Sequence, residues 1–156
     1  MRVLITAVGR LRGGPEAALV DDYLARLTRT GAALGLGPAE VVEVEDRAGG
    51  GPTAQAARLE RAIPEGARLC VLDERGRVLD SPGFAGRLAG WRDDGARVAA
   101  FVIGGADGVD PALRARADLV LSFGPMVWPH LLVRAMLAEQ LYRAATILAG
   151  SPYHRG

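Results

Sequence analysis

The segment best suited to holding a small ligand is the glycine-rich stretch from Ile103 to Gly108, Ile-Gly-Gly-Ala-Asp-Gly, which closes an apolar run. Three glycines after a buried strand let the backbone approach a ligand closely, because no Cβ atoms intervene. A tight turn that needs glycines for steric reasons alone explains the same residues. In open α/β sheets ligands bind beyond the carboxyl ends of the strands. Those ends are predicted at Gly9, Leu72-Asp73, Gly104-Gly105 and Ser122–Pro125.

Several common site chemistries lack support in this sequence. The glycine pattern is G-G-x-x-G and comes late in the chain, unlike the G-x-G-x-x-G of dinucleotide-binding folds. No G-K-S/T loop is present, which argues against a nucleotide triphosphatase. The two histidines and the one cysteine are far apart in sequence, so no metal site is expected. No serine has the G-x-S-x-G setting of a hydrolase nucleophile.

Five apolar strands alternate with helical segments and must position these residues. The predicted strands cover residues 2–8, 41–44, 68–72, 98–103 and 119–121. Pro15 opens the first helix, Ser81 caps a later one ahead of Pro82, and Asp110 caps a short one. The final helix runs from His130 to Leu148. This alternation predicts one α/β domain over residues 1–156, with a mostly parallel sheet and helices on both faces.

The composition is that of a soluble globular protein and gives no independent support for nucleic-acid binding. All 19 cationic side chains are arginine and the net charge is only +1, which is not the charge footprint of an RNA-binding protein. No stretch approaches the roughly 20 apolar residues of a membrane helix, so no membrane association is expected. The one cysteine, Cys70, lies in an apolar run and is expected to be a buried, inert thiol of a cytoplasmic protein.

The last predicted helix is apolar around nearly its whole circumference. Its apolar residues are Leu131, Leu132, Val133, Met136, Leu137, Leu141, Tyr142, Ile147 and Leu148. Such a helix must be covered on more than one side. In a chain of 156 residues we expect the second cover to be another subunit, which predicts a homodimer.

Motifs in the second half of the chain occur in an order that is specific as a set. They are Leu72-Asp73, Ile103–Gly108, Leu121–Met126, Trp128-Pro129-His130, Leu132-Val133-Arg134, Glu139–Ala144 and Pro152–Arg155. Together with the opening Ala7-Val8-Gly9, they resemble the RlmH family of SPOUT methyltransferases over essentially the full length. The I-G-G-x-x-G, P-H-x-L-x-R, E-Q-L-Y-R-A and P-Y-H-R elements carry this resemblance collectively, and none would suffice alone.

The resemblance implies a SPOUT-type C-terminal trefoil knot, a rare exception to the rule that chains do not thread loops. It implies S-adenosyl-L-methionine (SAM) as the cofactor. The substrate would be N3 of a pseudouridine in 23S rRNA, within the assembled ribosome. The family's cofactor motif matches Leu72, Gly104, Phe123, Gly124, Pro125, Met126, Val127 and Trp128. Residues 123–127 differ in detail from a typical member, but contact through the backbone is expected to tolerate this.

The resemblance also places Arg143, Tyr153, His154 and Arg155 in substrate binding and catalysis, because the family's tail folds over the cofactor site. Methylation at N3 requires loss of a weakly acidic imide proton, and a cation near the uracil oxygens favours the deprotonated ring. Tyr153 would stack on the base or hydrogen-bond to it. His154 is the first candidate for a general base, since histidines commonly exchange protons near neutral pH. Arg143 follows Glu139 by four residues and equally fits a structural ion pair.

Four alternatives stay open at this point. Arg10 and Arg12 either contact RNA or belong to a solvated loop, and His130 either contacts RNA or caps its helix and orients the preceding loop. A SPOUT enzyme that acts on tRNA would share the cofactor pocket but carry an added RNA-binding domain. A nucleotide-sensing module without catalysis would show the same periodicity, and only the tail and the full motif series argue against it. In the family interpretation, each site uses elements of both subunits.

Overall fold

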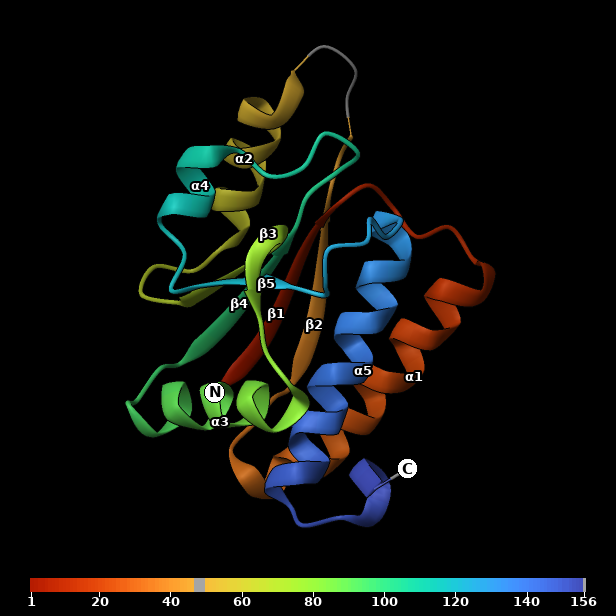
Figure 1. The fold of residues 1–156 in the computed structure, drawn as a ribbon, viewed down its shortest axis with the longest axis vertical. Helices are drawn as coiled ribbons and strands as arrows, with labels where there is room; N and C mark the ends of the chain where they lie inside the picture. Colours follow the sequence, from red (N-terminus) through yellow and green to blue (C-terminus); the bar gives the residue numbers. More distant parts are fainter. Residues whose placement is uncertain (47–49, 156) are drawn as a thin grey trace.

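The computed structural model describes residues 1–46 and 50–155 (Figure 1). Within them, five parallel strands form one sheet in the order β2-β1-β4-β3-β5. The strands are β1 (Arg2–Val8), β2 (Ala39–Val44), β3 (Arg68–Val78), β4 (Val98–Ile103) and β5 (Leu119–Ser122). The helices are α1 (Gly14–Gly31), α2 (Gly51–Ala62), α3 (Ser81–Asp93), α4 (Pro111–Ala115) and α5 (His130–Leu148), with 3-10 turns η1 (Ala32–Leu34) and η2 (Pro152–Arg155). The predicted α/β class is confirmed.

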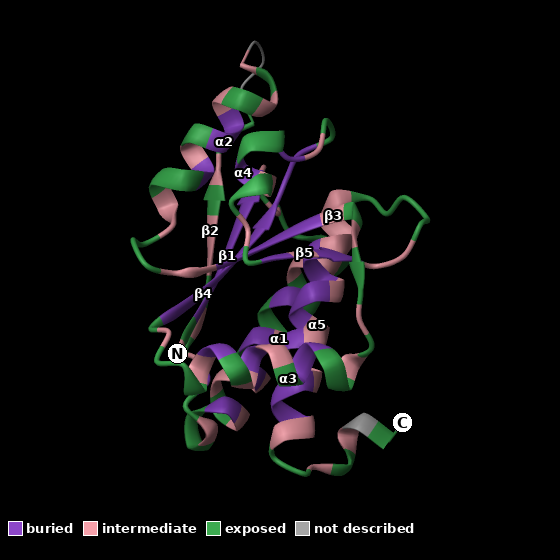
Figure 2. Cartoon of the chain, turned by 60° about the vertical axis from the view of Figure 1, so that its left-hand side comes forward, coloured by how far each residue is buried: buried purple, intermediate pink, exposed green. Residues whose placement is uncertain are grey.

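Helices cover both faces of the sheet, as predicted. On one face, Leu27 of α1 and Leu141 of α5 belong to the same buried cluster as Phe101 of β4, together with residues of α3. On the other face, Leu59 of α2 and Leu113 of α4 pack in a second cluster. Figure 2 shows the central strands as continuously buried ribbons. Parallel strands covered on both faces read as unbroken apolar runs, which is why their positions could be predicted.

Helix capping follows the prediction at α4 but not at α3. The Asp110 side chain accepts a hydrogen bond from the first turn of α4 at 2.8 Å. At α3 the predicted cap, Ser81, is already helical, and Asp80 is the N-cap instead. The Asp80 side chain accepts from the backbone N–H of Gly83 at 2.8 Å. The prediction of Ser81 was wrong because aspartate and serine are favoured about equally at N-caps. Pro82 does not distinguish them, since proline is accepted at the first or the second helical position.

Strand β3 is longer than predicted and carries a large bulge. The prediction ended it at Leu72, whereas the strand continues to Val78. Leu72 and Arg77 both lie opposite Leu121 of β5, so residues 73–76 project out of the ladder. The run Asp-Glu-Arg-Gly-Arg that follows Leu72 lacks the apolar alternation that indicates a strand. This extension was therefore missed.

Cys70 lies near the start of β3 and is fully buried. Burial raises the pKa of its thiol, so the reactive thiolate is not formed at neutral pH. The prediction of a buried, inert thiol is confirmed.

Helix α5 has the bounds that were predicted and packs against both α1 and α3. Leu137 and Leu141 are fully buried by this packing. Leu132, Val133 and Met136, in the first half of the helix, are only half-buried. The chain thus covers the apolar circumference of α5 only in part. None of the described helices, α5 included, has the length and hydropathy needed to cross a membrane.

Arg134 of α5 is a charged side chain that the fold encloses completely, with 0% of its side chain exposed. Nη1 donates to Oε2 of Glu43 at 2.7 Å, and Nη2 donates to the carbonyl oxygens of Val8 and Gly9 at 3.2 and 3.1 Å. Burial lowers the pKa of this guanidinium and Glu43 opposes that effect, but an arginine stays charged at neutral pH. The same Glu43 oxygen accepts the backbone N–H of Leu11 at 2.6 Å. Arg134 therefore ties α5 to the carboxyl ends of β1 and β2.

Replacing this buried arginine is expected to destabilise the fold strongly. Arg134→Ala leaves a cavity and removes the donors that Glu43, Val8 and Gly9 use. We expect the free energy of unfolding to fall by about 3 kcal/mol or more, measured by urea denaturation. Arg97→Ala, at an exposed position, is the control and should change it by less than about 0.5 kcal/mol. A loss below about 1 kcal/mol for Arg134→Ala would contradict the structural role assigned to this residue.

Candidate functional site

A cavity of about 300 Å³ opens at the carboxyl ends of β3, β4 and β5, beside the start of α5. Most residues predicted from the family's cofactor motif line it, namely Leu72, Gly104, Phe123, Gly124, Met126, Val127 and Trp128. Pro125 is not among the lining residues. The other lining residues lie outside that motif, and these are Asp73, Glu74, Arg75, Ile103, Gly105–Val109, Leu121, His130 and Val133. Of these, Asp73, Ile103 and Gly105–Gly108 belong to the strand end and the glycine-rich stretch that the sequence already indicated for a ligand. The structure brings the predicted cofactor residues together in one place.

One wall of the cavity is the backbone of the glycine-rich turn after β4. A Cβ on Gly104 would lie 2.6 Å from the carbonyl oxygen of Gly108, so only glycine lets the chain fold back here. The backbone N–H of Gly108 donates to the carbonyl oxygen of Gly105 at 3.0 Å and closes the turn. The steric interpretation of these glycines is confirmed at Gly104, and the close approach of a ligand stays a prediction. Steric need fixes the turn, and its glycines line the cavity with backbone atoms alone.

The opposite wall is the loop of residues 123–129 between β5 and α5. The indole Nε1 of Trp128 donates to the carbonyl oxygen of Phe123 at 3.4 Å. Met126, Val127 and Trp128 expose 70%, 81% and 40% of their surface. Neighbouring exposed apolar side chains of this size are typical of a ligand site or a protein contact. The wall is therefore apolar and open to a partner.

Asp73, the lining residue that follows Leu72, is an ionised group held by two arginines and is only 5% exposed. Oδ1 accepts the backbone N–H of Arg75 at 2.8 Å and its Nε at 3.2 Å, and Oδ2 accepts Nη1 of Arg114 at 2.9 Å. Burial by itself raises the pKa of this carboxyl, but the bonds from Arg75 and Arg114 outweigh burial and hold the pKa below its ordinary value. The sequence pointed to the strand end at Leu72-Asp73 but gave no signal for either arginine.

Arg143, Tyr153, His154 and Arg155, the predicted catalytic residues, lie at the far end of α5. Nε and Nη2 of Arg143 donate to Oε1 of Glu139 at 2.9 and 2.8 Å, so the structural ion pair is present. The Tyr153 hydroxyl donates to the same oxygen at 3.2 Å, and the Arg143 guanidinium carbon lies 5.1 Å from the centre of the Tyr153 ring. Arg155 is exposed. The side chain of His154 lies outside the described part of the chain.

The tail is packed on its own helix through a row of aromatic rings. The ring centres of Tyr153 and Tyr142 lie 4.7 Å apart, and those of Tyr142 and Tyr23 of α1 lie 6.2 Å apart. Burial, reinforced by Tyr23 and Glu139, raises the pKa of Tyr153, so its hydroxyl remains a donor at neutral pH. Chain ends ordinarily fray unless they are tied down, and here the rings and Glu139 hold the tail.

The tail and the cavity are separated by the whole of α5. His130 and Val133, at the start of the helix, line the cavity, whereas the tail follows its last residue, Leu148 (Figure 1). At 1.5 Å per residue, this helix is about 28 Å long. One chain therefore does not bring its predicted catalytic residues to its predicted cofactor residues.

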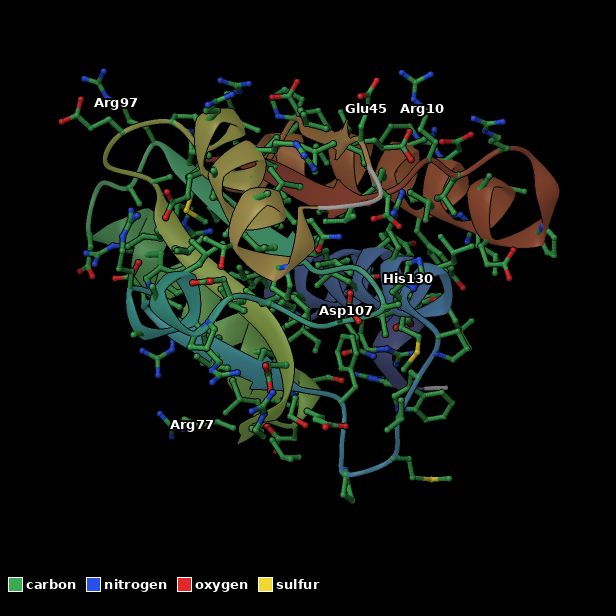
Figure 3. All side chains as sticks on the ribbon, turned by 90° about the horizontal axis from the view of Figure 1, so that it is seen from above. Arg10, Glu45, Arg77, Arg97, Asp107 and His130 are labelled. Carbon is green, nitrogen blue, oxygen red and sulfur yellow. The ribbon has the colours of Figure 1, made fainter. Side chains whose placement is uncertain are left out.

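His130 does not cap α5. The N-cap is Pro129, and no side-chain capping bond is present there. His130 instead lines the cavity together with Asp107, and both side chains are labelled in Figure 3. Asp107 belongs to the glycine-rich stretch predicted to hold a ligand, whereas His130 was left open, because a lone histidine at a helix start is also compatible with capping.

The first loop presents two arginines to solvent. Arg10 and Arg12 are exposed, and Figure 3 shows Arg10 pointing away from the molecule. Between them, Leu11 is tied by its N–H to Glu43. The loop is thus fixed in its middle while its charged side chains stay available.

Comparison with known proteins settles the family. Residues 1–154 match the family described as predicted SPOUT methyltransferase. The chain belongs to the SPOUT methyltransferases. Curated relatives named "Ribosomal RNA large subunit methyltransferase H" from Ruegeria pomeroyi and Roseobacter denitrificans are each 70% identical to it, over 99% of both chains. The relative of that name from Paracoccus denitrificans is 68% identical over the same shares. The resemblance inferred from the motifs is confirmed.

Solved structures support the same fold for this SPOUT methyltransferase. A probable methyltransferase from Bordetella pertussis aligns with a TM-score of 0.51 and 20% identity, over 92% of this chain and 96% of that one. A probable methylase family protein from Haemophilus influenzae aligns with a TM-score of 0.52 and 12% identity, over 97% and 69%. At such identities the shared property is the α/β architecture.

The lowered pKa of Asp73 predicts a pH-dependent contribution to stability. A carboxyl with a lowered folded-state pKa stabilises the fold above its unfolded pKa of about 3.9, and this contribution is lost as the pH falls through the folded pKa. Asp73→Asn should therefore lower the free energy of unfolding by about 1–2 kcal/mol at pH 7. The difference from the wild type should shrink below about pH 4.

Urea unfolding between pH 7 and pH 2.5 measures this difference. Asp21→Asn, an exposed position on α1, should show no comparable pH-dependent difference. If the free energy of unfolding of Asp73→Asn is as far below that of the wild type at pH 2.5 as at pH 7, the effect does not come from ionisation of Asp73.

Proposed function

We propose that this protein is a SAM-dependent methyltransferase that modifies N3 of a pseudouridine in 23S rRNA within the assembled ribosome. The observation that carries the proposal is the cavity at the ends of β3, β4 and β5, lined by the residues of the family's cofactor motif. The full-length likeness to relatives named for the ribosomal RNA large subunit supports the substrate. A ribosomal substrate places the protein in the cytoplasm.

The residues around the cavity suit SAM. Adenine needs apolar walls and a few backbone hydrogen bonds, which Leu72, Phe123 and the glycine turn after β4 offer. Glu74 and Asp107, on the same lining, suit the positive charges of a sulfonium and an ammonium group. SAM supplies a methyl group that its sulfonium already activates. The segments after β4 and β5 that form the two walls are also those that would form the trefoil knot.

Because the methyl group of SAM is already activated, the protein has to position the uracil ring and favour its deprotonated form. A guanidinium beside the uracil oxygens stabilises negative charge on the ring, and Arg143 and Arg155 are the candidates. Glu139 uses one carboxylate oxygen to hold both Arg143 and Tyr153, which keeps the cation and the aromatic ring in a fixed relation. His154 is the candidate for the residue that takes the N3 proton.

A site that uses both the cavity and the tail must combine two chains. The tail lies the length of α5 away from the cavity of its own chain. We therefore assign the protein a homodimer in which the tail of one subunit reaches the cavity of the other. This arrangement also gives the exposed apolar loop of residues 126–128 a partner.

A second cavity marks where the partner subunit would lie. Its volume is about 660 Å³, and it runs between α1, the end of β3 and α5. Leu19, Val78, Leu132 and Met136 line it, and Leu19 and Val78 are 42% and 71% exposed. The half-buried start of α5 faces this groove, so a second copy would complete the cover of that helix.

The charge of the chain favours a large, structured substrate over naked RNA. A net charge of +1 gives little of the sequence-independent attraction that drives binding to free RNA. A large folded particle can be recognised by its shape as well as by its phosphates, which compensates for the weak electrostatic attraction. Arg10 and Arg12 are the candidates for phosphate contacts outside the pocket.

Methylation of ribosomes tests the proposed function. Purified protein and SAM should add one methyl group to a pseudouridine of 23S rRNA in assembled ribosomes from a strain that lacks the enzyme, and add far less to protein-free 23S rRNA. Mass spectrometry of nuclease fragments identifies the modified position. Methyl transfer to tRNA, or none to ribosomes, would refute the proposal.

Mixing two inactive variants tests the shared site. A chain without residues 152–156 keeps its cavity, and Gly104→Ala keeps its tail but places a Cβ against Gly108. Each alone should be inactive. Random mixing puts one complete site in half of the dimers, so activity should return to about a quarter of the wild-type level. Sedimentation and circular dichroism confirm that each variant is a folded dimer. Absence of rescue in such a mixture would contradict a tail that acts across the dimer.

A further inference from the structure

The bulge in β3 is a feature that the sheet itself does not require. A regular strand would pass from Leu72 to its next partner without interruption, but residues 73–76 project before Arg77 resumes the ladder. A Cβ on Gly76 would lie 2.6 Å from the carbonyl oxygen of Val120, so a glycine is needed where the strand returns. Bulges of this kind occur beside active sites, where they re-aim a side chain. The bulge here lies on the rim of the cofactor cavity.

Hydrogen bonds from two other elements hold the bulge in place. Arg114 of α4 donates to Oδ2 of Asp73 at 2.9 Å. Ser122, at the end of β5, donates to the carbonyl oxygen of Glu74 at 3.1 Å. Within the bulge, Oδ1 of Asp73 accepts the backbone N–H of Arg75 at 2.8 Å. The position of Arg75 is therefore set by the fold.

The guanidinium of Arg75 keeps most of its binding capacity. Its Nε donates to Asp73 at 3.2 Å, and no bond from its two terminal nitrogens to another described residue is present. Asp73 already has a second cation in Arg114, so Arg75 is not needed to neutralise it. The Arg75 side chain is 68% exposed and is the only arginine among the described residues that line the cavity.

We propose that Arg75 binds the carboxylate of the amino-acid portion of the methyl donor. The inference rests on the proposed function, since it takes SAM as the occupant of the cavity. SAM carries two positive groups and one negative group. Glu74 and Asp107 suit the positive groups, and Arg75 is the lining arginine suited to the negative one. A guanidinium with two free N–H groups matches a carboxylate in a bidentate geometry.

Two ligands that differ by the amino-acid portion isolate this contact. S-Adenosylhomocysteine carries the carboxylate, whereas 5′-methylthioadenosine shares the adenosine and the thioether but lacks it. Arg75→Gln should weaken binding of S-adenosylhomocysteine about tenfold or more, which is the usual effect of losing a charged hydrogen-bonded pair. Its affinity for 5′-methylthioadenosine should stay within about twofold of the wild type. Calorimetry measures both.

Two matched variants refine the test. Arg75→Lys keeps the charge without the planar fork, and its loss of S-adenosylhomocysteine affinity should be intermediate. Arg77→Gln removes an arginine two residues along the same strand that does not line the cavity, and both affinities should be unchanged. Retained binding of 5′-methylthioadenosine shows that each variant is folded.

Three results would overturn the assignment. Equal weakening of both ligands by Arg75→Gln would mean that the residue shapes the cavity as a whole. Unchanged S-adenosylhomocysteine affinity, with the salt slope of ribosome binding reduced by about one, would mean a phosphate contact. A wild-type protein that binds neither ligand would remove the proposed function and this inference together. Wild-type binding with no effect of Arg75→Gln removes the inference alone.

Discussion

A buried arginine with a single carboxylate partner is the interaction on which the arrangement of the site depends. Arg134 joins α5 to Glu43 of β2 and to the carbonyl groups that end β1. An ion pair taken out of water contributes little net stability unless its remaining hydrogen bonds are satisfied. Here the backbone supplies two acceptors, while Nε of Arg134 has no hydrogen-bond partner among the described residues. The main effect of this ion pair is to position the start of α5 relative to the sheet. The start of α5 carries one wall of the cavity, and the other wall follows β4, the neighbour of β1. Arg134 therefore fixes one wall relative to the other.

The same helix separates two kinds of chemistry. Its start belongs to a cavity of glycine backbone and apolar side chains, suited to a nucleoside. Its end carries an ion pair and stacked aromatic rings, suited to a base and its developing charge. Since a helix is stiff over this length, the two cannot meet within one chain. The proposed site therefore requires two chains, and the half-buried apolar residues in the first half of α5 offer a surface for the second one.

The sequence predicted those parts of the fold that arise from apolar periodicity and from glycine. β1, β4 and α5 have the predicted bounds because each is a continuous apolar run or stripe. The cavity was predicted at the correct sheet edge because the strand ends are readable. The bulge after Leu72 was missed, since its pairing depends on β5 far along the chain.

Arg134 and the tail show the two remaining limits of prediction. An arginine on a helix is expected to be exposed, and its neighbours in the sequence do not indicate that Arg134 will be buried. The tail residues stood out in the sequence as a group that would ordinarily fray, and the packing of Tyr153 against Tyr142 explains why Tyr153 is held in place. Their distance from the cavity, however, follows only from the position of α5 in three dimensions.

The burial of Cys70 makes the native protein chemically silent toward thiol reagents. Since the chain has no other cysteine, a cysteine introduced on the tail or on the loop of residues 126–128 would be its only accessible thiol, and no native cysteine would have to be replaced first. Spin labels or fluorophores at these positions could then report distances between the subunits of the proposed dimer. Cys70 itself becomes reactive only when the centre of the sheet opens. The same molecule therefore contains its own internal reporter of unfolding.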